Sequence, residues 1–278
     1  MLCAVGLVVH TQPQGNDVYG VTSLGGLLYV IRDRASQQIS VYDVDSYRLQ
    51  RRINVSELED VVDMAACEHD HCLYISDTGE YIHSVALPDA AVIKWPVYDV
   101  PAGLSVTDTH SVLVTFEKVR KMKEFTTHGK LLRQIELPQS VVSPCHAIQL
   151  SSGEFIVCHG RTDDPVYGVC LVDSSGQVVK SYGGSQGSDS QQTNSPSHLA
   201  VDKNGFVFVA DIQSQQVLLL SPALTYVRDV VSHEQLKWYP FRLFLDDDRR
   251  QLYVIENECN DDDDDDKQIA GRLVVINV

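Results

Sequence analysis

Short apolar runs that end in a polar residue recur along the chain. Six of them share this form: LLYVIRD, CLYISD, VLVTFE, FIVCHG, VFVAD and LYVIEN. Their polar residues are Arg32, Asp77, Glu117, His159, Asp211 and Glu256, which stand 45, 40, 42, 52 and 45 residues apart. Six copies at this spacing match the length of one blade of a β-propeller. The pattern therefore predicts six similar sheets arranged in a ring.

Each unit divides into four short strands with turn residues between them. In the fifth unit the strands are SHLAVDK, FVFVAD, QVLLLSP and TYVRDVV, and the first turn is Asn-Gly. The inner strands are almost continuously apolar, as expected when both faces are covered, whereas outer strands such as LLRQIEL alternate. Only the short VSELEDVV stretch has a helical period. We therefore predict an all-β fold with four antiparallel strands per blade.

The last unit has only three strands, FRLFLDDD, QLYVIEN and RLVVINV, and the N-terminal CAVGLVVH is left over. Pairing that segment with the last blade would close the ring and remove two open sheet edges. A signal peptide is the alternative, but the segment lacks a basic start and a clear cleavage site. We predict one domain over residues 1–278, with a closing strand at 3–11 and blades at 17–55, 60–98, 101–137, 144–184, 195–231 and 239–278.

The repeats resemble those of NHL β-propellers. The resemblance is sharpest in SPSHLAVDKNGFVFVADIQSQQVLLLSP, residues 195–222, where a proline opens the strand and FVAD precedes the third strand. LYISDTGEYIHSV in the second unit matches less fully, and the third and sixth units are degenerate. The WD40 and kelch marks are absent. The resemblance implies a six-bladed propeller and, in many members, a substrate-recognition domain of a ubiquitin ligase that follows RING, B-box and coiled-coil segments. None of those segments is present, so we expect a free-standing relative or a fragment of a longer protein.

The charge of the chain disfavours a broad nucleic-acid role. The net charge is −16, and six consecutive aspartates at 261–266 contribute to it; we expect residues 260–267 to be extended and disordered. The one dense basic run, EKVRKMKEF, holds Lys118, Arg120, Lys121 and Lys123. Some NHL propellers bind RNA on a basic face, but alternation along a strand would send these side chains to opposite sides. RNA binding is the second alternative function.

The cysteine pattern favours a reducing compartment. The chain has seven cysteines, an odd number, and no CxxC: Cys3, Cys67, Cys72, Cys145, Cys158, Cys170 and Cys259. No apolar run approaches ~20 residues, so we expect no membrane span. These features predict a cytoplasmic, monomeric domain.

Four potential metal ligands stand close together in ACEHDHCLYISD: Cys67, His69, His71 and Cys72. In the predicted register, EHDH is a four-residue hairpin loop and the two cysteines face each other at its base. Zinc would need both histidines to fold back from a solvent-facing tip. A disulfide is allowed geometrically, but the compartment argues against it. We favour two small packed thiols at a turn.

The six polar strand ends are expected to converge near one mouth of the central channel. Four are carboxylates that could hold Ca²⁺, namely Asp77, Glu117, Asp211 and Glu256. The resemblance adds that calcium-dependent propeller lactonases and the related amidating lyase place metal there. With His159 as a general base, a metal-dependent hydrolase or lyase is the first alternative function. Two observations argue against this alternative. An Asp after a strand commonly accepts hydrogen bonds from turn amides, and the strand-end position of blade one is held by Arg32, which is a cation.

His146 in SPCHAIQL and His198 in SPSHLAVD hold the same position in adjacent units. Zinc-binding histidines of the amidating lyase also lie at the start of inner strands, directly after proline. Here each histidine stands one residue later, which can turn it to the opposite face of the strand. No third histidine occupies that position, because blade six has Phe241–Arg242 and blade three has Ala102–Gly103. We expect a pair of packed, hydrogen-bonded histidines.

These observations favour a non-catalytic scaffold without a cofactor; Ca²⁺ or Zn²⁺ would enter only under the enzyme alternative. A propeller fixes many loops on two broad faces, which suits it to binding a partner protein. The expected binding loops join the second and third strands of four blades: Asp33–Gln38, Asp77–Tyr81, Arg161–Tyr167 and Asp211–Gln216.

Overall fold

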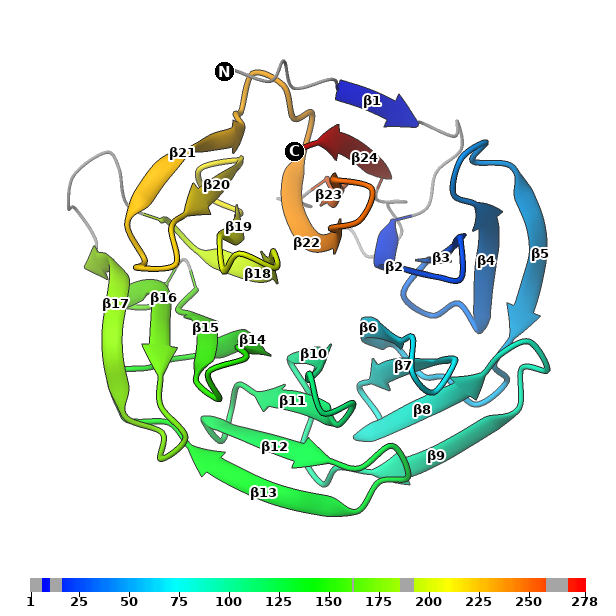
Figure 1. Ribbon diagram of the computed structural model, residues 1–278, viewed down its shortest axis with the longest axis horizontal. Coiled ribbons are helices and arrows are strands. Elements are labelled where there is room, and N and C mark those ends of the chain that lie inside the picture. Colours follow the sequence, from blue (N-terminus) through cyan, green and yellow to red (C-terminus); the bar gives the residue numbers. More distant parts are fainter. Residues whose placement is uncertain (1–6, 11–16, 162, 186–192, 259–269) are drawn as a thin grey trace.

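Six four-stranded sheets surround a central axis in the protein (Figure 1). The computed structural model describes residues 7–10, 17–161, 163–185, 193–258 and 270–278. All regular elements in these ranges are β-strands, and no helix occurs among them. The predicted all-β, six-bladed propeller is confirmed. The acidic run 260–267, Cys3 and Cys259 lie outside the described residues.

Blades one to three follow one another along the chain, and every sheet runs from its first strand at the axis to its fourth at the rim. Blade one comprises β2 (Val18–Leu24), β3 (Leu27–Arg32), β4 (Gln38–Asp43) and β5 (Leu49–Asn54). Blade two comprises β6 (Val61–Cys67), β7 (Cys72–Asp77), β8 (Tyr81–Ala86) and β9 (Val92–Pro96). Blade three comprises β10 (Gly103–Val106), β11 (Val112–Phe116), β12 (Lys121–Phe125) and β13 (Leu131–Glu136).

Blades four to six complete the ring. Blade four comprises β14 (Pro144–Gln149), β15 (Phe155–His159), β16 (Val166–Val172) and β17 (Val178–Ser185). Blade five comprises β18 (Pro196–Val201), β19 (Val207–Asp211), β20 (Gln216–Leu220) and β21 (Tyr226–Val231). Blade six comprises β22 (Tyr239–Asp246), β23 (Gln251–Asn257) and β24 (Gly271–Asn277), with β1 (Leu7–His10) at its rim.

The N-terminal strand closes the ring. β1 pairs antiparallel with β24, from Leu7 opposite Ile276 to His10 opposite Leu273 (Figure 1). Of the predicted closing strand 3–11, the structure describes residues 7–10, and residues 1–6 and 11–16 lie outside the described ranges. Because β1 pairs with the edge of β24, it supplies blade six with its fourth strand.

The hydrophobic core consists of six clusters, one between each pair of neighbouring blades. One cluster joins blades one and two through residues such as Ile31 and Ile75, and another joins blades six and one through Val30 and Tyr253. The other four occupy the remaining interfaces in turn. Second strands such as β7 are therefore buried along their whole length, whereas β5 and β13 at the rim are mostly exposed. Burial on both faces explains the continuous apolar runs in the sequence.

The Cys67–Cys72 segment is a β-hairpin, as predicted. Cys67 pairs with Cys72 across the ladder, and the four residues between them form a turn. Both side chains are buried and carry free thiols. The imidazole of His69 stacks on His110 of blade three at a centroid distance of 4.1 Å. The two cysteines thus pack as small apolar groups, and His69 contacts a neighbouring blade instead of folding back toward them.

The short helical period in VSELEDVV does not produce a helix. Residues 56–59 form a turn and a connecting segment, and β6 begins at Val61. Leu58 is buried in the cluster between blades one and two. The apolar spacing in this segment therefore reflects inward-facing residues of an interblade connection.

Candidate functional site

A one-residue irregularity near the start of the inner strand sets which side chains meet in the channel. One residue near the start of β2, β6, β14, β18 and β22 is passed over, so the register of these strands shifts there, whereas β10 pairs without a shift. The residue that begins the regular pairing lies opposite the penultimate residue of the second strand in blades one to five, and opposite Ile255, two residues before the end of β23, in blade six. In blade order these residues are Gly20, Asp63, Gly103, His146, His198 and Arg242. A bulge re-aims the side chains that follow it. The carboxylate, the two imidazoles and the guanidinium that meet in the channel therefore come from equivalent positions of their inner strands.

Asp63 is the centre of a hydrogen-bonded cluster in the channel. Its Oδ1 accepts from the backbone N–H of Met64 at 2.9 Å. Its Oδ2 accepts from the backbone N–H of Leu104 at 2.9 Å and from His198 Nε2 at 3.3 Å. Arg242 Nε lies 3.6 Å from Oδ1 as an ion pair, and its Nη2 donates to the Val62 carbonyl at 2.7 Å. One carboxylate thereby connects blades two, three, five and six.

The hydrogen-bond partners of the two histidines assign their tautomers. His198 Nδ1 accepts from the Leu243 N–H at 3.4 Å, so its Nε2 carries the proton donated to Asp63. His146 Nε2 lies 3.2 Å from the Leu104 carbonyl, which only accepts, so this Nε2 is also protonated. The rings stack with centroids 3.7 Å apart. The expected hydrogen-bonded pair is therefore present.

Burial and charge fix the protonation states of this cluster. Burial acts to raise the pKa of Asp63, but the charge of Arg242 and the hydrogen bond from His198 outweigh it and hold that pKa well below its usual value. Burial lowers the pKa of His198, and burial, aided by the charge of Arg242, lowers the pKa of His146 well below its usual value. At neutral pH the cluster is therefore a carboxylate, a guanidinium and two neutral imidazoles.

Asp63, His146 and His198 lie close enough to be considered as metal ligands, since their ligand atoms fall within 4.8 Å of one another. Their hydrogen bonds make a poor fit, because both Nε2 atoms carry protons in the assigned tautomers. A divalent cation would also lie beside the Arg242 guanidinium. The arrangement is better suited to tying blades together than to binding a metal.

Gly103 lets blade four approach blade three closely beside the Asp63 cluster. A Cβ at this position would lie 2.5 Å from the Cys145 carbonyl oxygen and 2.9 Å from the His146 Cα. Backbone atoms cannot yield as a flexible side chain can. A glycine is therefore required for His146 to reach the Leu104 carbonyl.

The strand-end side chains are used locally. Asp77 accepts from His83 Nε2 at 2.6 Å and from the Glu59 and Tyr81 amides. Asp211 accepts from the Asn194 amide at 2.8 Å, and Glu256 accepts from the Lys237 and Trp238 amides. In blades two, five and six, these carboxylates thus hold the segment that leads into the inner strand. Among the described residues they do not gather into a group of metal ligands.

The predicted end of the second strand in blade three is one residue too late. The last residue of β11 is Phe116, which pairs with Lys121 as Asp211 pairs with Gln216. Glu117 is the next residue, and its carboxylate pairs with Arg161 of blade four. A charged residue after an apolar run cannot by itself reveal where the ladder ends.

The remaining strand ends differ in charge state. His159 is buried, and burial lowers its pKa to about 4, so it is neutral at physiological pH. Burial raises the pKa of Asp211 to about 6, while hydrogen bonds to its carboxylate oppose the shift. At Asp77 burial acts to raise the pKa, but the hydrogen bond and charge of His83 outweigh it, so the pKa is lowered. Arg32 ends β3, and its Nε has no hydrogen-bond partner among the described residues.

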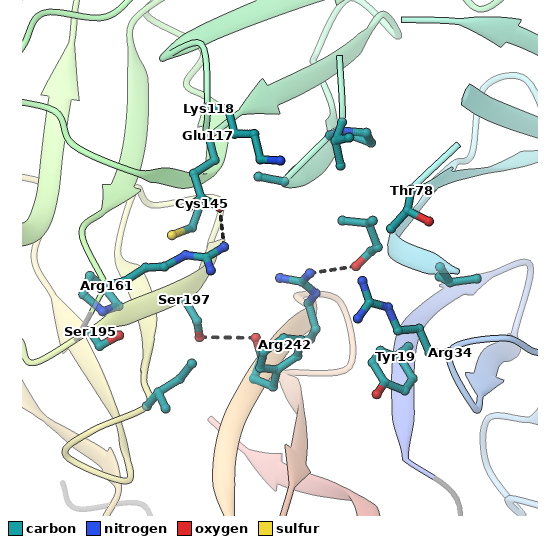
Figure 2. Close-up of a pocket in the computed structure, with 18 of the residues that line it drawn as sticks. Tyr19, Arg34, Thr78, Glu117, Lys118, Cys145, Arg161, Ser195, Ser197 and Arg242 are labelled. Carbon is teal, nitrogen blue, oxygen red and sulfur yellow. Dashed lines mark hydrogen bonds and ion pairs between the residues drawn. The ribbon is translucent and has the colours of Figure 1, made fainter. Parts of the chain in front are cut away.

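A cavity of about 560 Å³ opens at the end of the channel where these strands finish. Every blade contributes to its wall, and each of the four predicted loops supplies one of Arg34, Thr78, Arg161 and Ile212. Figure 2 shows Arg34 and Arg161 approaching from opposite sides, with Arg242 between them. Lys118 and Glu117 complete the charged residues of the wall. Of the six predicted strand-end residues, only Glu117 lines it.

The basic run contributes one residue to this cavity. Lys118 lines the cavity, and Lys121 pairs with Glu136 at 3.2 Å. Lys123 is buried and pairs with Asp99 at 2.9 Å, and Arg120 is exposed outside the cavity. The four side chains therefore have separate environments and do not form a basic stripe.

Sequence reasoning found the two histidines but missed Asp63 as their partner. Asp63 occupies the position of His146 and His198 in its own inner strand. Alignment of the units on their strand starts would have revealed it. Alignment on the polar strand ends did not, because the first hairpin differs in length between blades.

No protein-family model matches the sequence, and no curated protein sequence matches it either. Solved propellers match the whole structure. U3-55K is 13% identical with a TM-score of 0.67, and the match covers 98% of each chain. The virginiamycin B lyase from Staphylococcus aureus, as its H270A variant with quinupristin, is 10% identical with a TM-score of 0.64 and 99% coverage of each chain. The Swd1 propeller domain from Myceliophteria thermophila is 9% identical with a TM-score of 0.64, covering 98% of this chain and 100% of that one.

At these identities the comparisons establish the propeller fold. The described part of the chain also contains no helix long and apolar enough to cross a membrane.

Proposed function

We propose that this chain is a non-catalytic propeller that binds a partner protein at the face containing the cavity. The observation that carries the proposal is the cavity itself, because its wall draws residues from all six blades. A rigid ring holds such loops at fixed positions, which lowers the entropy cost of binding. Propellers of similar fold include both a lyase and other proteins, so the choice rests on the chemistry of the wall. Similarity to the substrate-recognition NHL domains of ubiquitin ligases, supported by residues 195–222, belongs to this proposal.

The wall offers little for acid–base catalysis. Among its described residues the one carboxylate, Glu117, is paired with Arg161, and none is a histidine. Cys145 is a potential nucleophile, but its thiol donates to the Ser143 carbonyl at 3.2 Å. A nucleophile is activated by a base within hydrogen-bond reach or by a lowered pKa. The described residues of the wall supply no such base, although the hydrogen bond with Cys158 and the charge of Arg161 lower the pKa of the Cys145 thiol against its burial.

A metal-dependent hydrolase or lyase is the second candidate function. It would use the Asp63, His146 and His198 group, whose ligand atoms lie within 4.8 Å of one another. The assigned tautomers and the adjacent Arg242 weigh against it. A rise in thermal stability with Zn²⁺ or Ca²⁺ that disappears in a His146→Asn variant would favour it over the scaffold.

Filling the cavity without changing its charge tests the proposal. We suggest the double variant Thr78→Tyr/Ile212→Tyr on the cavity face. The matched control is Ser152→Tyr/Asn204→Tyr on exposed turns at the opposite ends of the strands. A partner isolated by cross-linking to the wild-type chain, then purified, should lose at least tenfold in affinity for the filled variant and little for the control. Equal binding to all three proteins would contradict the proposal.

A further inference from the structure

The cavity wall is positively charged in a strongly acidic protein. Four of its residues are cations, Arg34, Lys118, Arg161 and Arg242, and one, Glu117, is a carboxylate. The whole chain has a net charge of −16. Three of the cations have a carboxylate partner, since Arg34 lies near Asp60, Arg161 pairs with Glu117 and Arg242 with Asp63, but among these carboxylates only Glu117 lines the cavity. The local field therefore selects for negative charge.

Arg242 is the buried member of this set. Its exposure is 7%, and one of its nitrogens donates to the Val62 carbonyl. Its Nε has no hydrogen-bond partner among the described residues, although a buried guanidinium normally uses its donors. That Nε lies on the side of Asp63, 3.6 Å from its Oδ1, whereas the guanidinium also lines the cavity. A guanidinium gains from further charge-assisted hydrogen bonds, and an oxyanion in the cavity would supply them to the nitrogens that face it.

Arg34 and Arg161 can complete the coordination from the rim. Arg34 makes only a loose contact with Asp60 at 3.7 Å, and both side chains are half exposed. Arg161 pairs with Glu117, so a guanidinium of this cavity already binds a carboxylate. That ion pair shows the kind of group that the arginines of the wall can bind. Guanidinium groups bind carboxylate and phosphate oxygens through two parallel hydrogen bonds.

We infer that the cavity binds an oxyanion, carboxylate or phosphate, carried by a side chain of an extended peptide segment of the partner and held by Arg242, Arg34 and Arg161. This inference rests on the proposed function. The volume of about 560 Å³ suits one or two side chains. The acidic remainder of the chain repels a long polyanion, which favours a short anionic group over a nucleic acid.

Titration with short peptides tests the inference. The probes are fluorescent Gly-Gly-Xaa-Gly-Gly peptides with Xaa as phosphoserine, glutamate or serine, with inorganic phosphate as the free-ion probe. Anisotropy is measured at low salt and near physiological salt, where the Debye length is about 8 Å. The anionic peptides should bind and the serine peptide should not. The stronger of the two identifies the source of the oxyanion, and phosphate should compete with it.

Three substitutions, two that should weaken binding and one that should strengthen it, locate the site. Arg34→Gln and Arg161→Gln should each weaken binding about five- to tenfold, since each removes a charge-assisted contact. Glu117→Gln should strengthen binding, because it frees Arg161 from a competing carboxylate. Arg48→Gln changes the net charge equally at an exposed site outside the cavity and should leave affinity within twofold.

A parallel series in which the six aspartates at 261–266 are replaced by asparagine controls for competition by the chain's own acidic run. Absence of anionic-peptide binding in both series would overturn the inference, as would equal weakening by Arg48→Gln. Binding of single-stranded RNA in place of the peptides, with the same arginine dependence, would assign the cavity to nucleic acid instead. In each of these cases the filled-cavity test above still decides whether a protein partner uses this face.

Discussion

The carboxylate of Asp63 accepts a hydrogen bond from His198 at 3.3 Å, although the two residues belong to blades on opposite sides of the channel. The same oxygen also accepts from the Leu104 amide of blade three. The channel is therefore spanned by a polar network and not filled by apolar side chains. Because the hydrogen bonds of a buried polar network hold its members in place, this contact helps to set the relative positions of the blades that form the cavity wall.

Removing the carboxylate should destabilise the fold. Asp63→Ala leaves the Arg242 guanidinium without its compensating charge and should lower the free energy of unfolding by about 3–5 kcal/mol. Asp60→Ala, which removes a half-exposed carboxylate, should cost less than about 1 kcal/mol. Urea unfolding measures both, and Asp63→Asn should fall between them. A cost for Asp63→Ala as small as that of Asp60→Ala would contradict the structural role of the network.

Stability should fall as the pH drops from about 6.5 to 4 through His159. Its folded pKa of about 4 lies below the ordinary value of 6.5, so in this window the unfolded chain binds a proton that the native state does not. The stability therefore rises with pH, by up to about 1.4 kcal/mol per pH unit. His159→Leu should flatten this slope in urea-unfolding measurements. An unchanged slope would show that the histidine is not buried in its neutral form.

Asp211 should act in the opposite direction. Its folded pKa of about 6 lies above the ordinary value of 3.8, so its neutral form stabilises the native state below about pH 4. That contribution is lost as the pH rises toward 6. Asp211→Asn should therefore steepen the gain in stability between pH 4 and 6 relative to the wild type. A shallower curve for the variant would mean that hydrogen bonding to the carboxylate outweighs its desolvation.

Chelation should leave thermal stability unchanged. A metal bound at a concentration one hundred times its dissociation constant would add about 2.7 kcal/mol, which corresponds to roughly 5–10 °C in a domain of this size. The hydrogen-bonded tautomers of His146 and His198 predict no such rise with Zn²⁺ or Ca²⁺ over EDTA. Calorimetric scans in the three conditions provide the measurement, and a rise with either ion would support the enzyme alternative.

Deleting residues 1–10 should open the ring. The change removes the pairing of β1 with β24, whose hydrogen bonds contribute roughly 2–4 kcal/mol at about 1 kcal/mol each. The exposed edge of β24 should also promote self-association. Urea unfolding and sedimentation velocity should show both effects. Unchanged stability and an unchanged sedimentation coefficient after the deletion would contradict closure by β1.

Local patterns determined most of the architecture. A strand covered on both faces must be apolar along its length, so runs such as the one before Asp77 mark the second strand of each blade. The missing fourth strand of the last unit and the extra N-terminal strand together predicted closure, and β1 pairs with β24 as expected. These features depend on neighbours in the same sheet, which the sequence encodes through its spacing.

The site depended on contacts that no local pattern contains. The convergence of Asp63, His146, His198 and Arg242 requires both the closed ring and a one-residue shift in the four inner strands that carry them, since a slip of one residue sends a side chain to the other face. A difference of one residue also explains why Phe116, and not Glu117, is the last paired residue of β11. The sequence by itself thus determined how many sheets form and how they close. Only the tertiary structure decided which charges meet at the axis, because that depends on backbone register and on distance across the channel.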